Sequence, residues 1–311
     1  MHLGILKVAA ALKERGAHVD NLDLSGVSNF EETVGNYVAN SDTSTFGITA
    51  TSPQMPATVR IVKAIRNKRP LAKIILGGPH VTLVNAALKQ EQKRGALGRG
   101  ERAMQQLSGI FDTLIFGDGE LAIFRALDKP ETRFIDADSA TSDLFLKKYQ
   151  LETIPFPARE LVDVASYKYT IDGVPAISMI AQLGCPFNCG FCGGRESDYL
   201  RRVRIRSTDN VIAEMRHIYE TYGIRGIMLY DDELNVNKNM VELMEAIAKL
   251  GDELKIEWRL RGFIKAELFN EKQALAMHNA GFREILTGFE SGSPLILRNI
   301  RKMATRDDNT R

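Results

Sequence analysis

The chain has 311 residues, of which 44% are apolar and 26% are charged, a balance typical of a globular protein with its own core. Its 41 lysines and arginines nearly cancel its 39 aspartates and glutamates, and the net charge of +2 gives no electrostatic reason to expect nucleic-acid binding. The length predicts about two domains. No apolar run approaches the roughly 18 residues that a membrane span needs. The chain opens with no secretory signal pattern, so we expect a cytoplasmic protein.

The N-terminal half alternates helical and strand patterns. Apolar residues at helical spacing predict helices at 3–14, 56–67, 81–90 and 120–127, and short apolar runs predict strands at 18–24, 45–49, 73–76 and 113–116. Gly16 follows the first helix as a natural stop, and Pro56 opens the second. Strands and helices that alternate at this spacing predict βαβ units around a parallel sheet.

Two glycine-rich segments follow strands of this predicted sheet: Gly77-Gly78-Pro79-His80 and Gly117-Asp118-Gly119-Glu120. Open parallel sheets bind their ligands beyond the carboxyl ends of the strands. Glycine at such a position lets backbone amides come close to a phosphate or a ring. A Gly-Gly pair after a strand also forms an ordinary tight turn, so the glycines alone leave both interpretations open.

Residues 131–170 show no clean periodicity and contain Ile154-Pro155-Phe156-Pro157-Ala158-Arg159. This composition predicts an inter-domain connection with an extended segment, although a plain surface loop would carry the same residues. We therefore divide the chain into an α/β domain at 1–138, a linker at 139–172 and a second domain at 173–311.

All three cysteines of the chain, Cys185, Cys189 and Cys192, fall within one eight-residue window with the spacing C-x3-C-x2-C. An odd number of thiols cannot all pair as disulfides, and three thiols on one loop favour a metal cluster. Iron–sulfur clusters are held by cysteine thiolates, usually four for a cubane. Three thiolates would leave one iron of a 4Fe–4S cluster without a protein ligand, and an open position is typical of a working metal site.

Zinc is the alternative occupant of such a loop. Structural zinc sites use four protein ligands, usually arranged as two pairs, and this sequence has no second pair of cysteines or histidines. A basic cluster follows the cysteines and consists of Arg195, Arg201, Arg202, Arg204 and Arg206. We interpret this cluster as a solvated or cofactor-facing rim in preference to an RNA-binding surface.

The C-terminal half has the rhythm of a (β/α) barrel. It predicts strands at 176–183, 226–230, 255–260 and 284–289, and helices at 208–222, 238–250 and 271–279. Polar residues follow three of the strands: Asp231 with Asp232, Arg261, and Glu290 with Ser291. Barrels place their active sites at this end of the strands. Plainer roles stay open, because aspartate suits a helix N-terminus and arginine forms ion pairs with neighbouring helices.

The cysteine spacing, with Phe191 directly before the third cysteine, resembles the signature of the radical S-adenosylmethionine (SAM) enzymes. Leu3-Gly4-Ile5-Leu6, Thr51-Ser52-Pro53-Gln54 and the two glycine-rich segments resemble the cobalamin-binding domain that precedes many radical SAM domains. The resemblance spans nearly the whole chain. It implies an α/β fold in which an incomplete Rossmann-like cobalamin-binding domain is followed by a partial (β/α) radical SAM barrel of four units.

The resemblance also implies the cofactors, namely a 4Fe–4S cluster, SAM and cobalamin. In this family SAM binds the open iron, and one electron from the reduced cluster cleaves SAM to methionine and a 5′-deoxyadenosyl radical. Family members carry out methylations, cyclisations or rearrangements at unactivated carbon. The partners to expect are an electron donor such as flavodoxin or ferredoxin and a small-molecule or peptide substrate, whose identity the sequence does not indicate.

The roles of individual residues are implied by their positions in the family's motifs. The cluster ligands would be Cys185, Cys189 and Cys192, with Phe191 near the adenine of SAM. Further contacts to SAM would come from Asp232, Arg261, Glu290 and Ser291. The cobalamin cavity would be lined by Ser52, Gly77, Gly78, Gly117 and Gly119.

The sequence departs from the family pattern at both ends. The family's first domain begins with a strand that cobalamin-ligating members follow with D-x-H-x-x-G, whereas this chain begins in the first helix and its nearest histidine, His2, is one place off. The family's barrel usually has more units than the four predicted here, which are followed by a polar tail at 301–311. We therefore expect a chain trimmed at both ends, and cobalamin is the cofactor that this expectation leaves open.

Two alternatives remain at this point. A methylthiotransferase-like radical SAM enzyme would share the barrel, but such enzymes carry additional cysteines for a second cluster, and this chain has none. A truncated protein that binds the cluster or cobalamin without turnover would agree with the missing strands, whereas the intact cysteine loop argues for chemistry.

Overall fold

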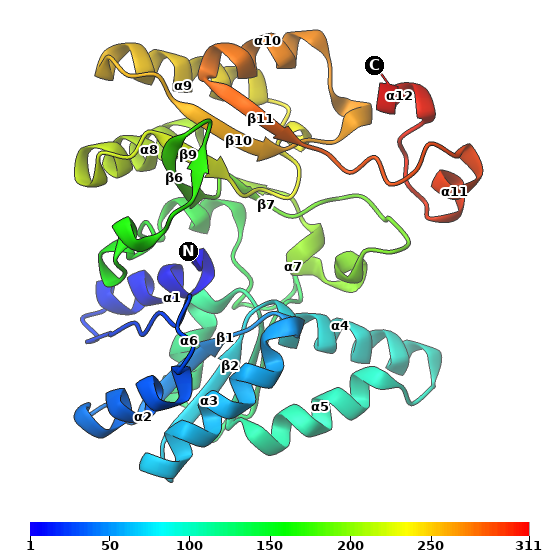
Figure 1. Ribbon diagram of the computed structural model, residues 1–311. Helices are drawn as coiled ribbons and strands as arrows, with labels where there is room; N and C mark the ends of the chain where they lie inside the picture. Colours follow the sequence, from blue (N-terminus) through cyan, green and yellow to red (C-terminus); the bar gives the residue numbers. More distant parts are fainter. Residues whose placement is uncertain (311) are drawn as a thin grey trace.

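The computed structural model, which describes residues 1–310, contains two main sheets of largely parallel strands, each packed against helices (Figure 1). The first sheet has the strand order β1-β2-β3-β4, and every neighbouring pair is parallel. Its strands are β1 (Thr45–Thr49), β2 (Lys73–Gly77), β3 (Thr113–Gly117) and β4 (Phe134–Ala137). The accompanying helices are α1 (Leu3–Glu14), α2 (Phe30–Asn40), α3 (Met55–Lys68), α4 (Pro79–Arg94), α5 (Arg99–Ile110) and α6 (Gly119–Asp128).

Alternate residues of these strands point to opposite faces of the sheet. Ile74 and Leu76 of β2 pack in a core with α2, α3, α4 and α5, whereas Ile75 packs in a second core with α1 and α6. All three side chains are buried. Helices on both faces explain why the strands read as continuous apolar runs, because a parallel sheet is buried on both sides.

The second main sheet has the order β11-β10-β9-β6-β5. Its strands are β5 (Thr170–Ile171), β6 (Val174–Met179), β9 (Gly226–Leu229), β10 (Arg259–Phe263) and β11 (Phe282–Leu286), all parallel except β5. The helices α8 (Thr208–Tyr222), α9 (Met240–Leu254) and α10 (Glu271–Ala280) pack against one face through Ile177, Ile227 and Leu260. The opposite face carries Met228 and Phe263, which lie in a small cluster with β5.

A short segment of the chain lies between the two main sheets. After β6 the chain forms β7 (Gln182–Leu183), the cysteine loop, the 3-10 helix η5 (Gly193–Glu196), α7 (Asp198–Arg201) and β8 (Arg204–Ile205). Figure 1 shows α7 between the two main sheets, beside α4 of the first. The chain then ends in α11 (Pro294–Asn299) and α12 (Arg306–Thr310) after the last strand.

The expected fold class is confirmed: a Rossmann-like parallel sheet precedes four parallel strands arranged as in part of a (β/α) barrel. The helix predicted at 3–14 and the helix predicted at 208–222 have the bounds that the structure shows. The predicted strand at 255–260 was placed too early, since β10 spans Arg259–Phe263. The structure also contains α2, α5 and β4, which the pattern did not predict.

The strand predicted at 18–24 is wrong. Within residues 1–310 this segment pairs with no other strand, and β1 forms the edge of its sheet. A cavity of about 530 Å³ lies beside that edge, lined by α1, β1 and residues 17–25. An apolar run becomes a strand only where a neighbouring strand completes its hydrogen bonds, and within residues 1–310 this segment makes no such pairing.

The strand predicted at 176–183 is interrupted. The structure ends β6 at Met179 and begins β7 at Gln182. The Asp231 carboxylate accepts the backbone N–H groups of Ala181 and Gln182, at 2.7 and 3.1 Å. A side chain therefore takes the place of a sheet neighbour at this break.

Candidate functional site

The cysteine loop begins at a turn that favours glycine. Gly184 has φ = +87°, and a Cβ there would lie 2.2 Å from the Arg202 carbonyl oxygen. Cys185 then donates its backbone N–H to the Leu200 carbonyl at 2.9 Å. The pairing of β7 with β8 holds the two sides of the loop together. The start of the loop is therefore fixed against the segment that follows it.

Two arginines hold the backbone of the loop itself. Arg201 donates to the carbonyl oxygens of Phe187 and Pro186, at 2.5 and 2.7 Å. Arg195 donates to the Gly190 carbonyl oxygen at 2.5 Å. Arg201 also lies 3.5 Å from Asn188 Oδ1, and none of these bonds engages a thiol.

The three cysteines carry free thiols, with Cys185 and Cys189 partly buried and Cys192 exposed. The Cys192 N–H donates to the Cys189 carbonyl at 3.1 Å, which brings these two residues into one turn. Within residues 1–310, no three His, Cys, Asp or Glu side chains are gathered as a ready metal site. The donor set nevertheless fits an iron–sulfur cluster, because three thiols of one loop are available and none is held in a disulfide.

Two aspartates at the end of β9 support the approach to this loop. Asp231 is buried and accepts the two backbone N–H groups at the break before β7. Asp232 accepts the Gly184 N–H at 2.9 Å. Neither carboxylate serves here as a helix N-cap, the plainer role that the sequence left open. Both instead fix the backbone that leads into Cys185.

The electrostatics beside Cys185 oppose a free thiolate. Burial raises the pKa of the Cys185 thiol, and the carboxylates of Glu233 and Asp232 add to the rise, whereas the Phe187 backbone and Lys265 oppose it. Burial also raises the pKa of Glu233 to about 7. Metal coordination deprotonates a thiol outright, so thiolate formation at Cys185 would depend on the metal.

Lys265 brings a buried positive charge to the same region. Its side chain is 2% exposed, and Nζ lies 2.5 Å from Glu267 Oε1. Nζ also lies 4.2 Å from the centre of the Phe187 ring, a cation–π distance. No pattern in the sequence indicated a role for this residue, which follows the end of β10 by two positions.

The remaining residues expected to contact SAM lie on the second sheet, on the loop after it and, for Phe191, on the cysteine loop itself. Arg261 Nη1 lies 3.1 Å from Glu284 on β11 and 3.3 Å from the Tyr169 hydroxyl, while its Nε is buried without a partner. The ion pair that the sequence left open for Arg261 thus exists, but with a neighbouring strand and not with a helix.

The other three lie on loops. Glu290 has φ = +59° and its Oε1 lies 3.5 Å from Lys302 Nζ. The Ser291 hydroxyl accepts the Ser293 N–H at 3.1 Å. Phe191 is 56% exposed and lies on the surface beside Cys192.

Hydrogen bonds connect the strand ends of the first sheet. Ser52 Oγ, after β1, lies 2.9 Å from Nδ1 of His80, after β2. Thr82 Oγ1 donates to the Gly78 carbonyl at 2.9 Å and accepts the Gly117 N–H at 3.0 Å. The segments expected to line a cobalamin cavity are therefore brought together at one edge of the sheet.

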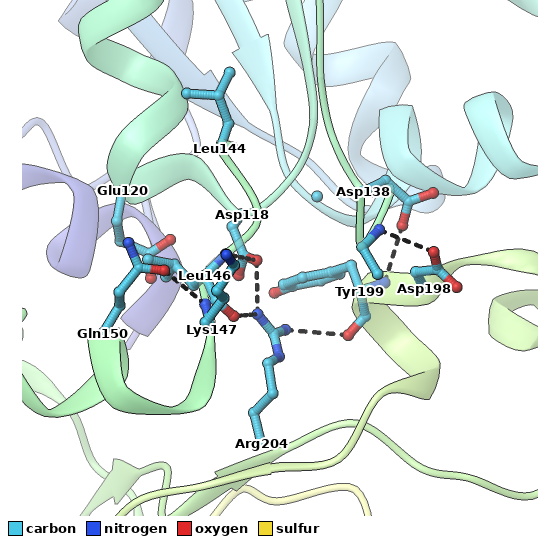
Figure 2. Close-up of polar contacts among 12 residues, drawn as sticks. Asp118, Glu120, Asp138, Leu144, Leu146, Lys147, Gln150, Asp198, Tyr199 and Arg204 are labelled. Atoms are coloured by element: carbon cyan, nitrogen blue, oxygen red, sulfur yellow. Dashed lines mark hydrogen bonds and ion pairs between the residues drawn. The ribbon is translucent and has the colours of Figure 1, made fainter. Parts of the chain in front are cut away.

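The segment after β3 is also closely packed. Gly117, which ends β3, has φ = +82°, and a Cβ there would lie 2.5 Å from the Ala137 carbonyl group. Gly77 ends β2, and Gly119 begins α6. Between the two glycines of the β3 exit, Asp118 contacts Arg204 of β8 at 2.6 Å (Figure 2). The C-terminal ends of the strands of the first sheet thus face the segment that follows the cysteine loop.

The basic cluster, which we expected to form a solvated or cofactor-facing rim, is not solvated throughout. Arg204 is 3% exposed beside Asp118, and Arg206 contacts the buried Glu214. Arg201 and Arg195 are bound to the loop backbone, and Arg202 is the most exposed of the five. The partner of Arg204 lies 86 residues earlier in the chain, so a local pattern could not predict that this arginine is buried.

Comparison with known proteins identifies the two halves. The model of the B12 binding domain matches residues 1–108, and the model of the radical SAM superfamily matches residues 179–311. An uncharacterized methyltransferase of Pyrococcus horikoshii, PH0819, is 31% identical over 261 residues, which cover 83% of this chain and 54% of the relative. The chain thus spans about half the length of this relative.

Two solved structures share the fold. The radical SAM methyltransferase TsrM from Kitasatospora setae, with cobalamin and a [4Fe–4S] cluster bound, matches with a TM-score of 0.70 at 17% identity, over 99% of this chain and 60% of that chain. The cobalamin-dependent radical SAM enzyme OxsB, with aqua-cobalamin bound, matches with a TM-score of 0.73 at 16% identity, over 99% and 44%.

The chain therefore belongs to the radical SAM proteins that carry a B12-binding domain. Membership defines its cofactors as a 4Fe–4S cluster, SAM and cobalamin. The methylthiotransferase-like alternative is not favoured, because the N-terminal half matches a B12-binding domain and contains no cysteine. Within residues 1–310 no helix is long and apolar enough to cross a membrane.

Proposed function

We propose that this chain carries the radical-generating and cobalamin-binding parts of a methyltransferase that acts on unactivated carbon. The observation that carries the proposal is the arrangement of the two halves. The cysteine loop and the glycine-rich edge of the first sheet lie on either side of one short segment, residues 193–205, which contacts both. The relatives PH0819 and TsrM bear the name methyltransferase, which favours methyl transfer over cyclisation or rearrangement.

When bound, the three cofactors would supply one-electron cleavage of SAM and a methyl carrier. In the proposed site, Cys185, Cys189 and Cys192 hold the cluster by three thiolates. Arg261 would contact a carboxylate of SAM; its Nε is buried and has no hydrogen-bond partner in this structure. The strand-end glycines Gly77, Gly78, Gly117 and Gly119, with Ser52, line the cobalamin side.

The neighbouring side chains would hold the loop and contact SAM. Phe191 would change from an exposed side chain to one covered by adenine. Asp232 fixes Gly184, and Glu290 with Ser291 lies in the loop after β11, where SAM polar groups would be held.

We also place the domain boundaries at 138/139 and 172/173. We expect the protein to act in the cytoplasm on a small-molecule substrate. Its electron donor would be of the flavodoxin or ferredoxin type.

The experiment is anaerobic reconstitution with iron and sulfide, followed by dithionite and SAM, with 5′-deoxyadenosine and methionine as the products assayed. We expect both products from the wild type and neither from C192A. A reduced cluster that leaves SAM intact would show a cofactor-binding protein without turnover. Failure to form a cluster would overturn the proposal.

A further inference from the structure

Residues 193–205 are attached to the first sheet by buried carboxylates. Asp118, in the loop after β3, is 1% exposed, and its Oδ2 lies 2.6 Å from Arg204 Nη1. The same oxygen accepts the Leu146 N–H at 2.9 Å. Arg204 also donates to the carbonyl oxygens of Leu146 and Tyr199, at 2.9 and 3.2 Å. Figure 2 shows Arg204 at the centre of this network, reaching from β8 toward the first sheet.

A second carboxylate holds the other end of the segment. Asp138, just after β4, accepts the Ser197 hydroxyl and the Tyr199 N–H, the latter at 3.2 Å. In return, Asp198 accepts the Ala140 N–H at 2.9 Å (Figure 2). Both Asp118 and Asp138 come from strand ends of the first sheet, so residues 193–205 lie directly on the edge where the proposed cobalamin site is built.

The same residues hold the cysteine loop on their other side. Leu200 accepts the Cys185 N–H, and Arg201 binds two carbonyl groups of the loop. Arg204 itself is the register partner of Leu183, two residues before Cys185. A continuous chain of hydrogen bonds therefore runs from the β3 exit to the first cysteine.

The Asp118–Arg204 pair has unused hydrogen-bonding capacity. Asp118 Oδ1 and Arg204 Nε are both buried without a hydrogen-bond partner. Buried polar groups normally find partners, so a second arrangement that satisfied these atoms would compete with the one seen. Gly117, the residue before Asp118, is the register partner of Ala137 on β4, and a Cβ at Gly117 would lie 2.5 Å from the Ala137 carbonyl group. A ligand seated against Gly117 would therefore lie one residue from the pair.

We propose that Asp118 and Arg204 are positioning residues that couple occupancy of the cobalamin side to the conformation of the cysteine loop. The inference rests on the proposed function for the identity of the ligand. It goes beyond that function because it assigns to a buried ion pair the transmission of a conformational change between the two halves. Neither residue is placed in contact with a cofactor, so the readout must report on the loop and not on turnover.

The test is hydrogen–deuterium exchange of residues 183–205 in the cluster-free full chain, with and without hydroxocobalamin. We expect cobalamin to slow exchange there by about fivefold or more in the wild type, as for typical coupling between sites. In D118N/R204Q, which removes both charges together, we expect the slowing to disappear while cobalamin absorbance shows that the ligand remains bound.

A matched control separates coupling from stability. Arg66 and Asp112 form a partly buried pair at 2.6 Å wholly within the half of the chain that contains the first sheet, so R66M/D112N should keep the full slowing. If the double variant fails to fold, R204K takes its place in the test. Lysine keeps the positive charge but lacks the planar guanidinium group that reaches Leu146 and Tyr199, so the slowing of exchange should be smaller.

Unchanged slowing in a folded D118N/R204Q or R204K would overturn the inference and leave the proposed function intact. Equal loss of slowing in R66M/D112N would also overturn it, because the effect would then follow from general destabilisation. A wild type that binds no cobalamin would overturn the cobalamin part of the proposed function and this inference with it.

Discussion

The carboxylate of Asp232 accepts the backbone N–H of Gly184 at 2.9 Å, one residue before the first cysteine. The end of β9 therefore sets the position of the cysteine loop through a side-chain contact and not through sheet pairing. Because Gly184 is followed directly by Cys185, the orientation of the first thiol depends on Asp232, a residue 48 positions after Gly184.

Removing this contact should impair cluster assembly. D232A leaves the Gly184 N–H without its acceptor, which should cost about 1 kcal/mol of loop stability. We expect less iron per chain after reconstitution, measured by metal analysis, with the far-UV spectrum unchanged. D209A, which removes an exposed aspartate in the first turn of α8, is the control. Equal iron in all three proteins would contradict the role given to Asp232.

Gly184 should tolerate substitution far less well than another glycine of similar backbone conformation. Both Gly184 and Gly173 have positive φ, but a Cβ at Gly173 would meet nothing within 4 Å, whereas at Gly184 it would clash with the Arg202 carbonyl. G173A should cost about 1 kcal/mol of unfolding free energy from backbone strain alone. G184A should cost clearly more in urea unfolding, and equal costs would contradict the structure.

Asp231 should make the protein less stable as the pH rises. Burial raises its pKa to about 7, against 3.8 in the unfolded chain. The folded state then holds the proton more tightly, so this contribution is complete below about pH 4 and is lost as the pH rises through 7. The full shift corresponds to about 4 kcal/mol.

The variant D231N should flatten this dependence. Asparagine can accept the N–H groups of Ala181 and Gln182 through its amide oxygen and does not ionise. We expect the loss of unfolding free energy between pH 5 and pH 8 to be smaller in D231N than in the wild type, by urea unfolding at both values. Asp118 and Glu233 also have pKa values raised to about 7 by burial, so part of the dependence should remain. An unaltered slope in D231N would exclude the assigned cause.

The charges around Cys185 should control its reactivity in opposite directions. Lys265 lowers the pKa of the thiol and Glu233 raises it. In the cluster-free protein at pH 8, K265M should therefore slow the alkylation of Cys185 by iodoacetamide, and E233Q should speed it. Peptide mass spectrometry measures each cysteine separately, and Cys192 serves as the internal reference. A change of the same sign in both variants would point to loosening of the loop and would contradict the electrostatic explanation.

Local patterns in the sequence predicted the parts of the molecule that are held together locally. The periodicity of α1 and α8 fixed their bounds, and the cysteine spacing located the loop. The segment at 18–24 failed because strand formation depends on a neighbour that periodicity does not report. Arg204 was expected at the surface because its partner, Asp118, lies 86 residues earlier in the chain. Contacts of that range follow from the packing of the two sheets, which no window of sequence contains.

Because Asp118 and Arg204 lie far apart along the chain, Asp118 is synthesised well before Arg204. The ribosome completes every strand of the first sheet, through Ala137, well before it reaches residue 204. Domains generally fold as they emerge, N-terminal first. The nascent first domain therefore holds Asp118 at an edge still open to water, and its charge loses that hydration only when the later segment docks. Closure of the two halves is thus a late step of folding, after the glycine-rich edge has formed.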